Sequence, residues 1–125
     1  MTLVLDAGAL NALERGERPM WTRLKAAKMA GDVPVTHAGV LGQVWRGSPR
    51  QAQLARALRG IKVQSLDERL GRSAGVLLGK ADLSDVIDAA VVLLSADGDD
   101  IVTSDPDDLS LLAASAGRHV ELIRP

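Results

Sequence analysis

Short apolar segments alternate along the chain with longer segments of helical periodicity. Five short segments have the length and composition of buried strands: Thr2–Leu5, Val33–Thr36, Ile61–Ser65, Ile101–Thr103 and Val120–Ile123. The segments between them carry apolar residues at helical spacing and are bounded by Gly, Pro or a capping Ser or Asp. Strands separated by helices predict an α/β domain with a mostly parallel central sheet.

Capping residues set the expected helix boundaries. Ser48 followed by Pro49 is a helix start, with Ser as the cap and Pro at the first helical position. The most apolar helix starts at Ser84 or Asp85 and covers Val86–Leu94. It is apolar nearly all round, which predicts a central buried helix. The other helices are expected to end near these residues: Arg15, Gly31, Arg46, Leu78 and Ala116.

Composition narrows the class of protein. A length of 125 residues fits one domain, residues 1–125, and 46% hydrophobic with 25% charged residues is typical of a globular chain. The start of the chain lacks the basic region of a signal peptide, and no apolar run is long enough for a membrane span. The absence of Cys excludes disulfides and thiolate chemistry and is compatible with the cytoplasm.

The acidic residues are concentrated in one part of the sequence. Nine Asp and no Lys or Arg occur between Asp82 and Asp108, so this block carries -9 and the rest of the chain +8, which together give the net charge of -1. An acidic cluster can hold hard cations, and the basic remainder can bind polyanions or an acidic partner.

Three carboxylates, two from this block and one from the start of the chain, are expected to meet at one edge of the sheet. Asp6 directly follows the first strand, Asp105 comes two residues after Thr103 at the end of the fourth, and Asp85 opens the central helix with Asp88 one turn on. Parallel strands place their carboxyl ends at one edge, where open α/β sheets bind ligands. Carboxylates held close together must be protonated or bind cations, so a divalent ion such as Mg²⁺ or Mn²⁺ is predicted.

Each acid also has a simpler interpretation. Asp6, Asp85 and Asp105 are all at positions where a side chain can cap a helix, and Asp88 is a first-turn acid that the helix dipole favours. The sequence Asp97-Gly98-Asp99-Asp100 predicts a solvated turn. The functional interpretation depends on the coincidence of several acids with no neighbouring basic residue.

Four sequence segments together resemble the PIN domain, in particular the VapC-type ribonuclease toxins. They are LeuValLeuAspAlaGlyAlaLeu from residue 3, ValThrHisAlaGlyValLeuGlyGlnValTrpArgGly from 35, SerAspValIleAspAlaAlaValValLeuLeu from 84 and IleValThrSerAspProAspAspLeu from 101. Each motif is weak alone, but they occur in order and at the expected spacing over nearly the whole chain. The resemblance implies a PIN-like three-layer α/β/α fold, RNA cleavage with Mg²⁺ or Mn²⁺, a homodimer and a cognate antitoxin.

The resemblance also assigns the acids. Asp6 matches the first family acid, Asp85 the third and Asp105 the fourth, and Asp88 is an additional acid. The second acid is normally Glu, but Gln43 occupies that position. An amide is a weaker metal ligand, although its oxygen can accept a hydrogen bond from water.

The expected chemistry is metal-assisted hydrolysis of an RNA phosphodiester bond. Asp6, Asp85 and Asp105 are predicted metal ligands, and Asp88 or Gln43 is expected to position a water. Thr103 is a candidate support for the site, and Arg46 is a candidate contact for the RNA phosphates. His37 and His119 are predicted to be structural.

Other functions fit less well or differ in class. An aspartyl-phosphate phosphatase usually has a second Asp at position 8, which here is Gly, and a phospho-receiver domain needs a late Lys, whereas none follows Lys80. The remaining alternative is a PIN-fold binding module that has lost catalysis, which Gln43 favours. The antitoxin is expected to offer a basic or hydrophobic peptide beside the acids.

Overall fold

The computed structural model describes residues 1–125 and contains one five-stranded sheet in the order β3-β2-β1-β4-β5. Every neighbouring pair of strands is parallel, with Val4 opposite Val35 and Ile101. The strands are β1 Leu3–Leu5, β2 Val35–His37, β3 Lys62–Gln64, β4 Asp100–Val102 and β5 Glu121–Ile123. The predicted α/β class is therefore confirmed, and the sheet is parallel throughout.

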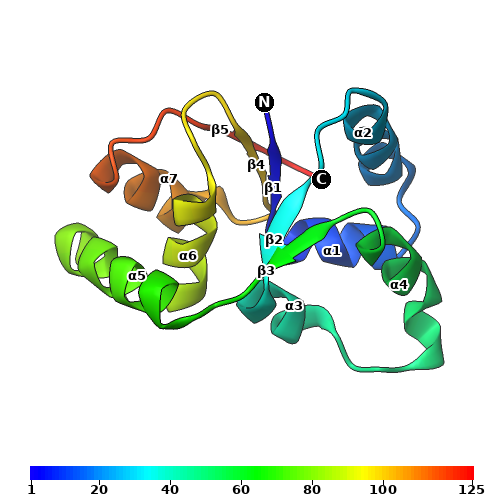
Figure 1. The fold of residues 1–125 in the computed structure, drawn as a ribbon, viewed down its shortest axis with the longest axis horizontal. Helices are drawn as coiled ribbons and strands as arrows, with labels where there is room; N and C mark the ends of the chain where they lie inside the picture. The colour runs from blue at the N-terminus through cyan, green and yellow to red at the C-terminus, as the bar shows by residue number, and fades with distance from the viewer.

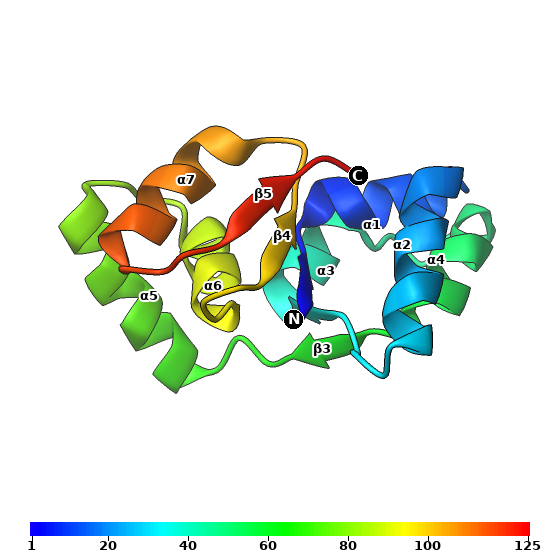
Figure 2. The ribbon, with the colours of Figure 1, turned by 90° about the horizontal axis from the view of Figure 1, so that it is seen from above.

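Helices cover both faces of this sheet, giving three layers (Figure 1). Figure 2 shows α5, α6 and α7 on one side of the strands and α1, α2 and α4 on the other. The helices are α1 Ala7–Glu14, α2 Arg18–Met29, α3 Ala38–Val44, α4 Ala52–Leu58, α5 Glu68–Ala81, α6 Val86–Leu94 and α7 Pro106–Ser115, with a 3₁₀ turn at Pro49–Gln51. No helix combines the length and the apolar character needed to cross a membrane.

The central strands and α6 form the core, as the apolar runs predict. All three residues of β1 are buried, and Ala89–Val92 of α6 are fully buried. Asp85 is the cap residue of α6, and Asp67 caps α5 by accepting a hydrogen bond from the Leu70 N–H at 2.9 Å. Of the two predicted starts of the central helix, Ser84 and Asp85, the structure has Asp85.

β2 and the segment after Ser48 differ from the sequence prediction, and α5 runs to Ala81 instead of ending near Leu78. β2 begins at Val35 rather than Val33, because Pro34 has no N–H to donate to a ladder and Val33 is exposed. Ser48 does cap the chain at Pro49, with its hydroxyl accepting from the Arg50 N–H at 3.1 Å, but the turn that follows is 3₁₀ before α4 begins.

The acidic block is divided between the two edges of the sheet. Asp97, Asp99 and Asp100 lie at the amino end of β4, whereas Asp85, Asp88 and Asp105 belong to segments at the carboxyl edge. The prediction of a solvated turn is wrong for Asp99, which is buried. Its carboxylate accepts hydrogen bonds from the Thr2 and Ala96 N–H groups, both at 2.8 Å, so it joins the first strand to this turn.

Candidate functional site

The candidate site lies at the carboxyl edge of β1 and β4, the point where the strand order reverses direction. Their register pairs Leu5 with Val102, and the Asp6 N–H continues the ladder to the Val102 carbonyl at 3.0 Å. Asp6 and Thr103 are therefore the first residues beyond two adjacent strand ends. Open α/β sheets bind ligands at such a switch point.

Asp6 is held by a side chain from the neighbouring strand end rather than by its own helix. Its carboxylate is buried and accepts a hydrogen bond from the Thr103 hydroxyl at 2.9 Å, and it makes no capping bond to α1. The Thr103 hydroxyl oxygen in turn accepts the Asp105 N–H at 3.0 Å. One buried hydroxyl thus fixes Asp6 and the backbone at Asp105 relative to each other.

The capping interpretation holds for only one of the three acids. Asp85 caps α6, with Oδ1 accepting from the Ile87 and Asp88 N–H groups at 2.9 and 3.2 Å. Asp105 occupies the cap position of α7 but makes no side-chain capping bond, and its carboxylate is exposed. The carboxylates of Asp6 and Asp105 therefore make no capping hydrogen bond, and Oδ2 of Asp85 makes none either.

Asp88 is the centre of the electrostatic cluster. The pKa of its carboxyl is raised from 3.8 to about 7, first by burial and then by the negative charges of Asp85, Asp6, Asp108 and Asp105. The three acids predicted as metal ligands thus all raise the pKa of Asp88. Asp108 is an addition that we did not assign from the sequence, although its position three residues after Asp105, on the same face of α7, was a usable signal.

No basic side chain compensates this negative charge. The ion pairs of the protein are Arg15–Glu17 and Arg72–Glu68, and both are exposed. Close carboxylates without a cationic partner favour either protonation or a bound cation, and their oxygen atoms suit a hard divalent ion. However, no three acidic or His side chains lie close enough together to ligate one ion as they stand. The charge of the site fits a cation, while a complete ligand set is not assembled.

The two other predicted site residues lie on or beside α3. Gln43 is exposed and its side chain makes no hydrogen bond. The Arg46 guanidinium donates to the backbone carbonyls of Gly42, Gln43 and Trp45 at 2.7–3.2 Å. Arg46 therefore terminates α3, because the last carbonyls of a helix lack partners within the helix.

His37 has a structural position, as predicted. It is fully buried at the end of β2, where Nδ1 accepts from the Gly39 N–H at 3.0 Å. Nε2 therefore carries the proton and donates to the Ile87 carbonyl at 3.0 Å. This contact fastens the first turn of α6, which carries Asp88, to the end of β2.

Gly8 allows the loop after β4 to approach α1. A Cβ at this position would lie 2.1 Å from Oγ and 2.9 Å from the backbone N of Ser104, next to Asp105. We expect Gly8→Ala to lower the free energy of unfolding by about 1–3 kcal/mol, because the loop must move. Gly42→Ala is the matched control, since no atom lies within 4 Å of its Cβ and it should stabilise α3 by up to about 1 kcal/mol. Urea unfolding of both variants measures the difference, and equal stability would contradict the close approach.

Comparison with known proteins identifies the fold. No family profile and no curated protein matches the sequence. Among solved structures, a chain of VapBC2 from Rickettsia felis, crystallised with a DNA fragment from its promoter, superimposes with a TM-score of 0.68. The match covers 98% of both chains at 12% sequence identity. An identity this low establishes architecture only, and the chain is a PIN-like α/β protein with the fold of a VapBC2 chain.

Proposed function

We propose that the protein is a metal-dependent endoribonuclease and the toxin component of a type II toxin–antitoxin system. The observation that carries the proposal is the uncompensated group of carboxylates around Asp88 at the switch point of a PIN-like sheet. Mg²⁺ or Mn²⁺ would neutralise the negative charge of such a group through oxygen ligands, and these ions assist phosphodiester hydrolysis. The fold shared with a VapBC2 chain supports the same conclusion.

Each side chain has a role in this proposal that its environment supports. Asp6, Asp85 and Asp105 would hold the cation through oxygen atoms that make no capping bond. A bound divalent ion would polarise the scissile phosphate and offset negative charge that develops on it. Asp88, half-buried among these acids, would accept a proton from the attacking water. Thr103 keeps Asp6 and the Asp105 backbone in register.

The partners follow from the same proposal. The cognate antitoxin binds this protein and blocks the acidic edge with a basic or hydrophobic segment, and two copies of the chain form a homodimer. The protein acts in the cytoplasm on cellular RNA. Opposite charge would steer a basic segment toward an acidic edge.

The direct test is an RNA cleavage assay with the purified chain. Mixed single-stranded and structured RNAs are incubated with Mg²⁺, with Mn²⁺ and with EDTA, and the products are resolved by length. We expect cleavage with either ion, loss of cleavage with EDTA, and products that carry 5′-phosphate and 3′-hydroxyl ends. Cleavage at full rate in EDTA, or binding of neither ion at millimolar concentration, would overturn the proposal.

A non-catalytic PIN-fold module is the second candidate. Two observations favour it: Gln43 replaces the usual Glu, and no three carboxylates form a ready ligand group. Such a protein binds its partner or RNA without cutting it. The cleavage assay and metal titration separate the two candidates, because the module leaves RNA intact and binds neither Mg²⁺ nor Mn²⁺ at millimolar concentration.

Gln43→Glu tests how far the Gln43 amide lowers Mg²⁺ affinity and cleavage at the site. We expect a gain in Mg²⁺ affinity of about 10-fold with faster cleavage, because a carboxylate is a better ligand or water acceptor than an amide. Gln53→Glu is the matched control, since Gln53 is an exposed Gln on α4. Isothermal titration with Mg²⁺ measures the affinities. An equal change in both variants would remove Gln43 from the site.

A further inference from the structure

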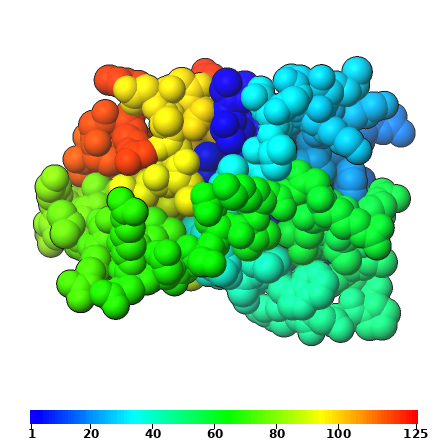
Figure 3. All heavy atoms as spheres, viewed as in Figure 1, coloured from blue at the N-terminus to red at the C-terminus, as the bar shows by residue number.

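A basic groove lies between α2 and α4, away from the acids. It has a volume of about 680 Å³, and its lining includes four cationic side chains: Lys25, Lys28, Arg56 and Arg59. The segments of α2 and α4 adjoin on the face of the molecule seen in Figure 3. Asp32 is the acidic residue of the lining, and it forms no ion pair with any of the four. The lining therefore has more cations than acids, and none of its four cations is held in an ion pair.

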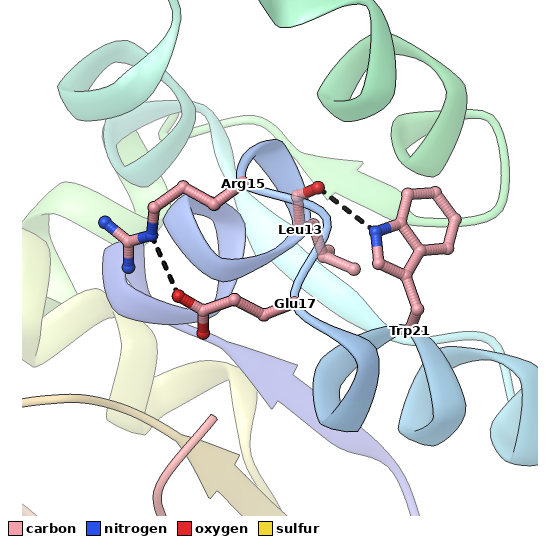
Figure 4. Close-up of polar contacts among 4 residues, drawn as sticks. All are labelled: Leu13, Arg15, Glu17 and Trp21. Atoms are coloured by element: carbon pink, nitrogen blue, oxygen red, sulfur yellow. Dashed lines mark hydrogen bonds and ion pairs between the residues drawn. The ribbon is translucent and has the colours of Figure 1, made fainter.

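Trp21 supports one of these cations. Its indole N–H donates to the Leu13 carbonyl at 3.1 Å, which fixes the ring against the end of α1 (Figure 4). The Arg56 guanidinium lies over this ring, 4.7 Å from the centroid. The stacked guanidinium forms no hydrogen bond within the protein, so its N–H fork remains available to an anion. Arginine in this state suits two-point recognition of phosphate oxygens.

The four charges form two short rows. Lys25 and Lys28 are three residues apart on α2, and Arg56 and Arg59 are three apart at α4, so each pair lies on one helix face about 5–6 Å apart. All four side chains are exposed. Two rows of exposed cations along an open groove match a ligand with a repeating anionic backbone better than a single small anion.

The groove and the acids lie at opposite edges of the sheet. Pro34 and Gly60 of the groove precede β2 and β3, whereas Asp6 and Asp105 follow β1 and β4. The acidic edge repels phosphates until a cation binds there. A second surface must therefore supply the attraction that brings a polyanion to the protein.

We propose that this groove binds the phosphate backbone of single-stranded RNA at a distance from the acids. The choice of RNA rests on the proposed nuclease function, whereas the inference that the ligand is a repeating anion rests on the two rows of cations in the groove. Trp21 acts as a platform that holds Arg56, and the two lysines and Arg59 neutralise adjacent phosphates. Binding here does not depend on Mg²⁺ and does not involve cleavage.

The test is RNA binding in EDTA, which separates this groove from catalysis. Fluorescence anisotropy follows a labelled mixed-sequence single-stranded RNA with the wild-type chain and with Lys28→Glu/Arg59→Glu. We expect the double variant to bind at least about 10-fold more weakly and the slope of log K against log salt to fall by about 1.4, two phosphate contacts at 0.7 each. Arg69→Glu/Lys80→Glu on α5 changes the net charge equally and should bind RNA nearly as the wild type does, because those two exposed residues lie outside the groove.

Two further measurements keep the result decisive. Arg56→Lys retains the charge but loses the fork, and it should weaken binding by about 3- to 10-fold without lowering Tm. Polyglutamate of equal charge serves as a competitor. Equal weakening by the two double variants, or displacement of RNA by polyglutamate as effectively as by unlabelled RNA, would overturn the proposal. Because Mg²⁺ is absent, loss of binding here and failure to cleave are separate outcomes.

Discussion

Asp6→Asn is expected to reduce RNA cleavage by at least about 100-fold while the protein stays folded. The side chain is buried next to Thr103, and the amide has the same shape as the carboxylate, so its oxygen can still accept the Thr103 hydroxyl. What is lost is one negative charge and one cation ligand. A larger effect is expected here than the roughly 10- to 100-fold typical of outer partners such as Thr103, because Asp6 is a proposed direct ligand.

The measurements for Asp6→Asn are cleavage rate, Mg²⁺ affinity and Tm. Asp107→Asn is the matched control, because Asp107 is an exposed acid in the first turn of α7 and does not contribute to the raised pKa of Asp88. We expect Asp107→Asn to keep cleavage within about 2-fold of the wild type. A folded Asp6→Asn protein that cleaves RNA at the wild-type rate in Mg²⁺ would refute the assignment of the site.

The fold could be predicted from the sequence because its signals are local. Apolar runs of strand length, Gly at helix ends and the Asp and Pro residues at helix starts each act within a few residues. Errors occurred where a single backbone group decided the outcome, as at Pro34, which delays β2, and at Pro49, which starts a 3₁₀ turn. The strand order 3-2-1-4-5 depends on long-range packing, and the sequence did not predict which strands are neighbours; the adjacency of the first and fourth strands was only a condition for the acids to meet.

The candidate site was only partly accessible to sequence reasoning. The grouping of acids could be anticipated because parallel strands end at one edge. Whether a given Asp caps a helix could not, because Asp6, Asp85 and Asp105 occupy equivalent positions and only Asp85 makes the capping bonds. The choice is made by tertiary contacts such as the Thr103 hydroxyl, which comes from a strand 97 residues away.

The basic groove is a second feature that the sequence did not reveal. Its cations come from two helices about 30 residues apart in the chain, and no local pattern joins them. The excess of positive charge outside the acidic block predicts that a polyanion or an acidic partner can bind, without giving the place. Arg46 caps its own helix, and its contact with RNA phosphates stays a prediction.

Asp88→Asn is expected to stabilise the metal-free protein at alkaline pH, to stabilise it less as the pH falls, and to leave it unchanged only below about pH 3.8. The pKa of Asp88 is about 7 in the folded protein and 3.8 in an unfolded chain. Between these two values the folded state keeps a proton that the unfolded state releases, so stability falls as pH rises and levels off above about pH 7. Replacement by the amide removes this dependence.

The expected gain at about pH 8 is roughly 1–2 kcal/mol. The full shift corresponds to about 4 kcal/mol at 1.36 kcal/mol per pKa unit, and the partial exposure of Asp88 reduces it through solvent screening. Urea unfolding in EDTA at about pH 5 and about pH 8 measures the gain, which should be less than half as large at about pH 5, because the unfolded chain already releases the Asp88 proton there. Asp107→Asn is the control that should change little at either pH.

Mg²⁺ connects this stability effect with the proposed function. If the cation occupies the acidic edge, it should stabilise the wild type at about pH 8 and narrow the difference from Asp88→Asn, because binding to the folded state alone raises the free energy of unfolding. A gain in stability for Asp88→Asn that is the same at acid and alkaline pH would mean that ionisation of the Asp88 carboxyl does not destabilise the folded protein. The cluster would then offer no electrostatic reason to bind a cation, and the nuclease proposal would lose its main support.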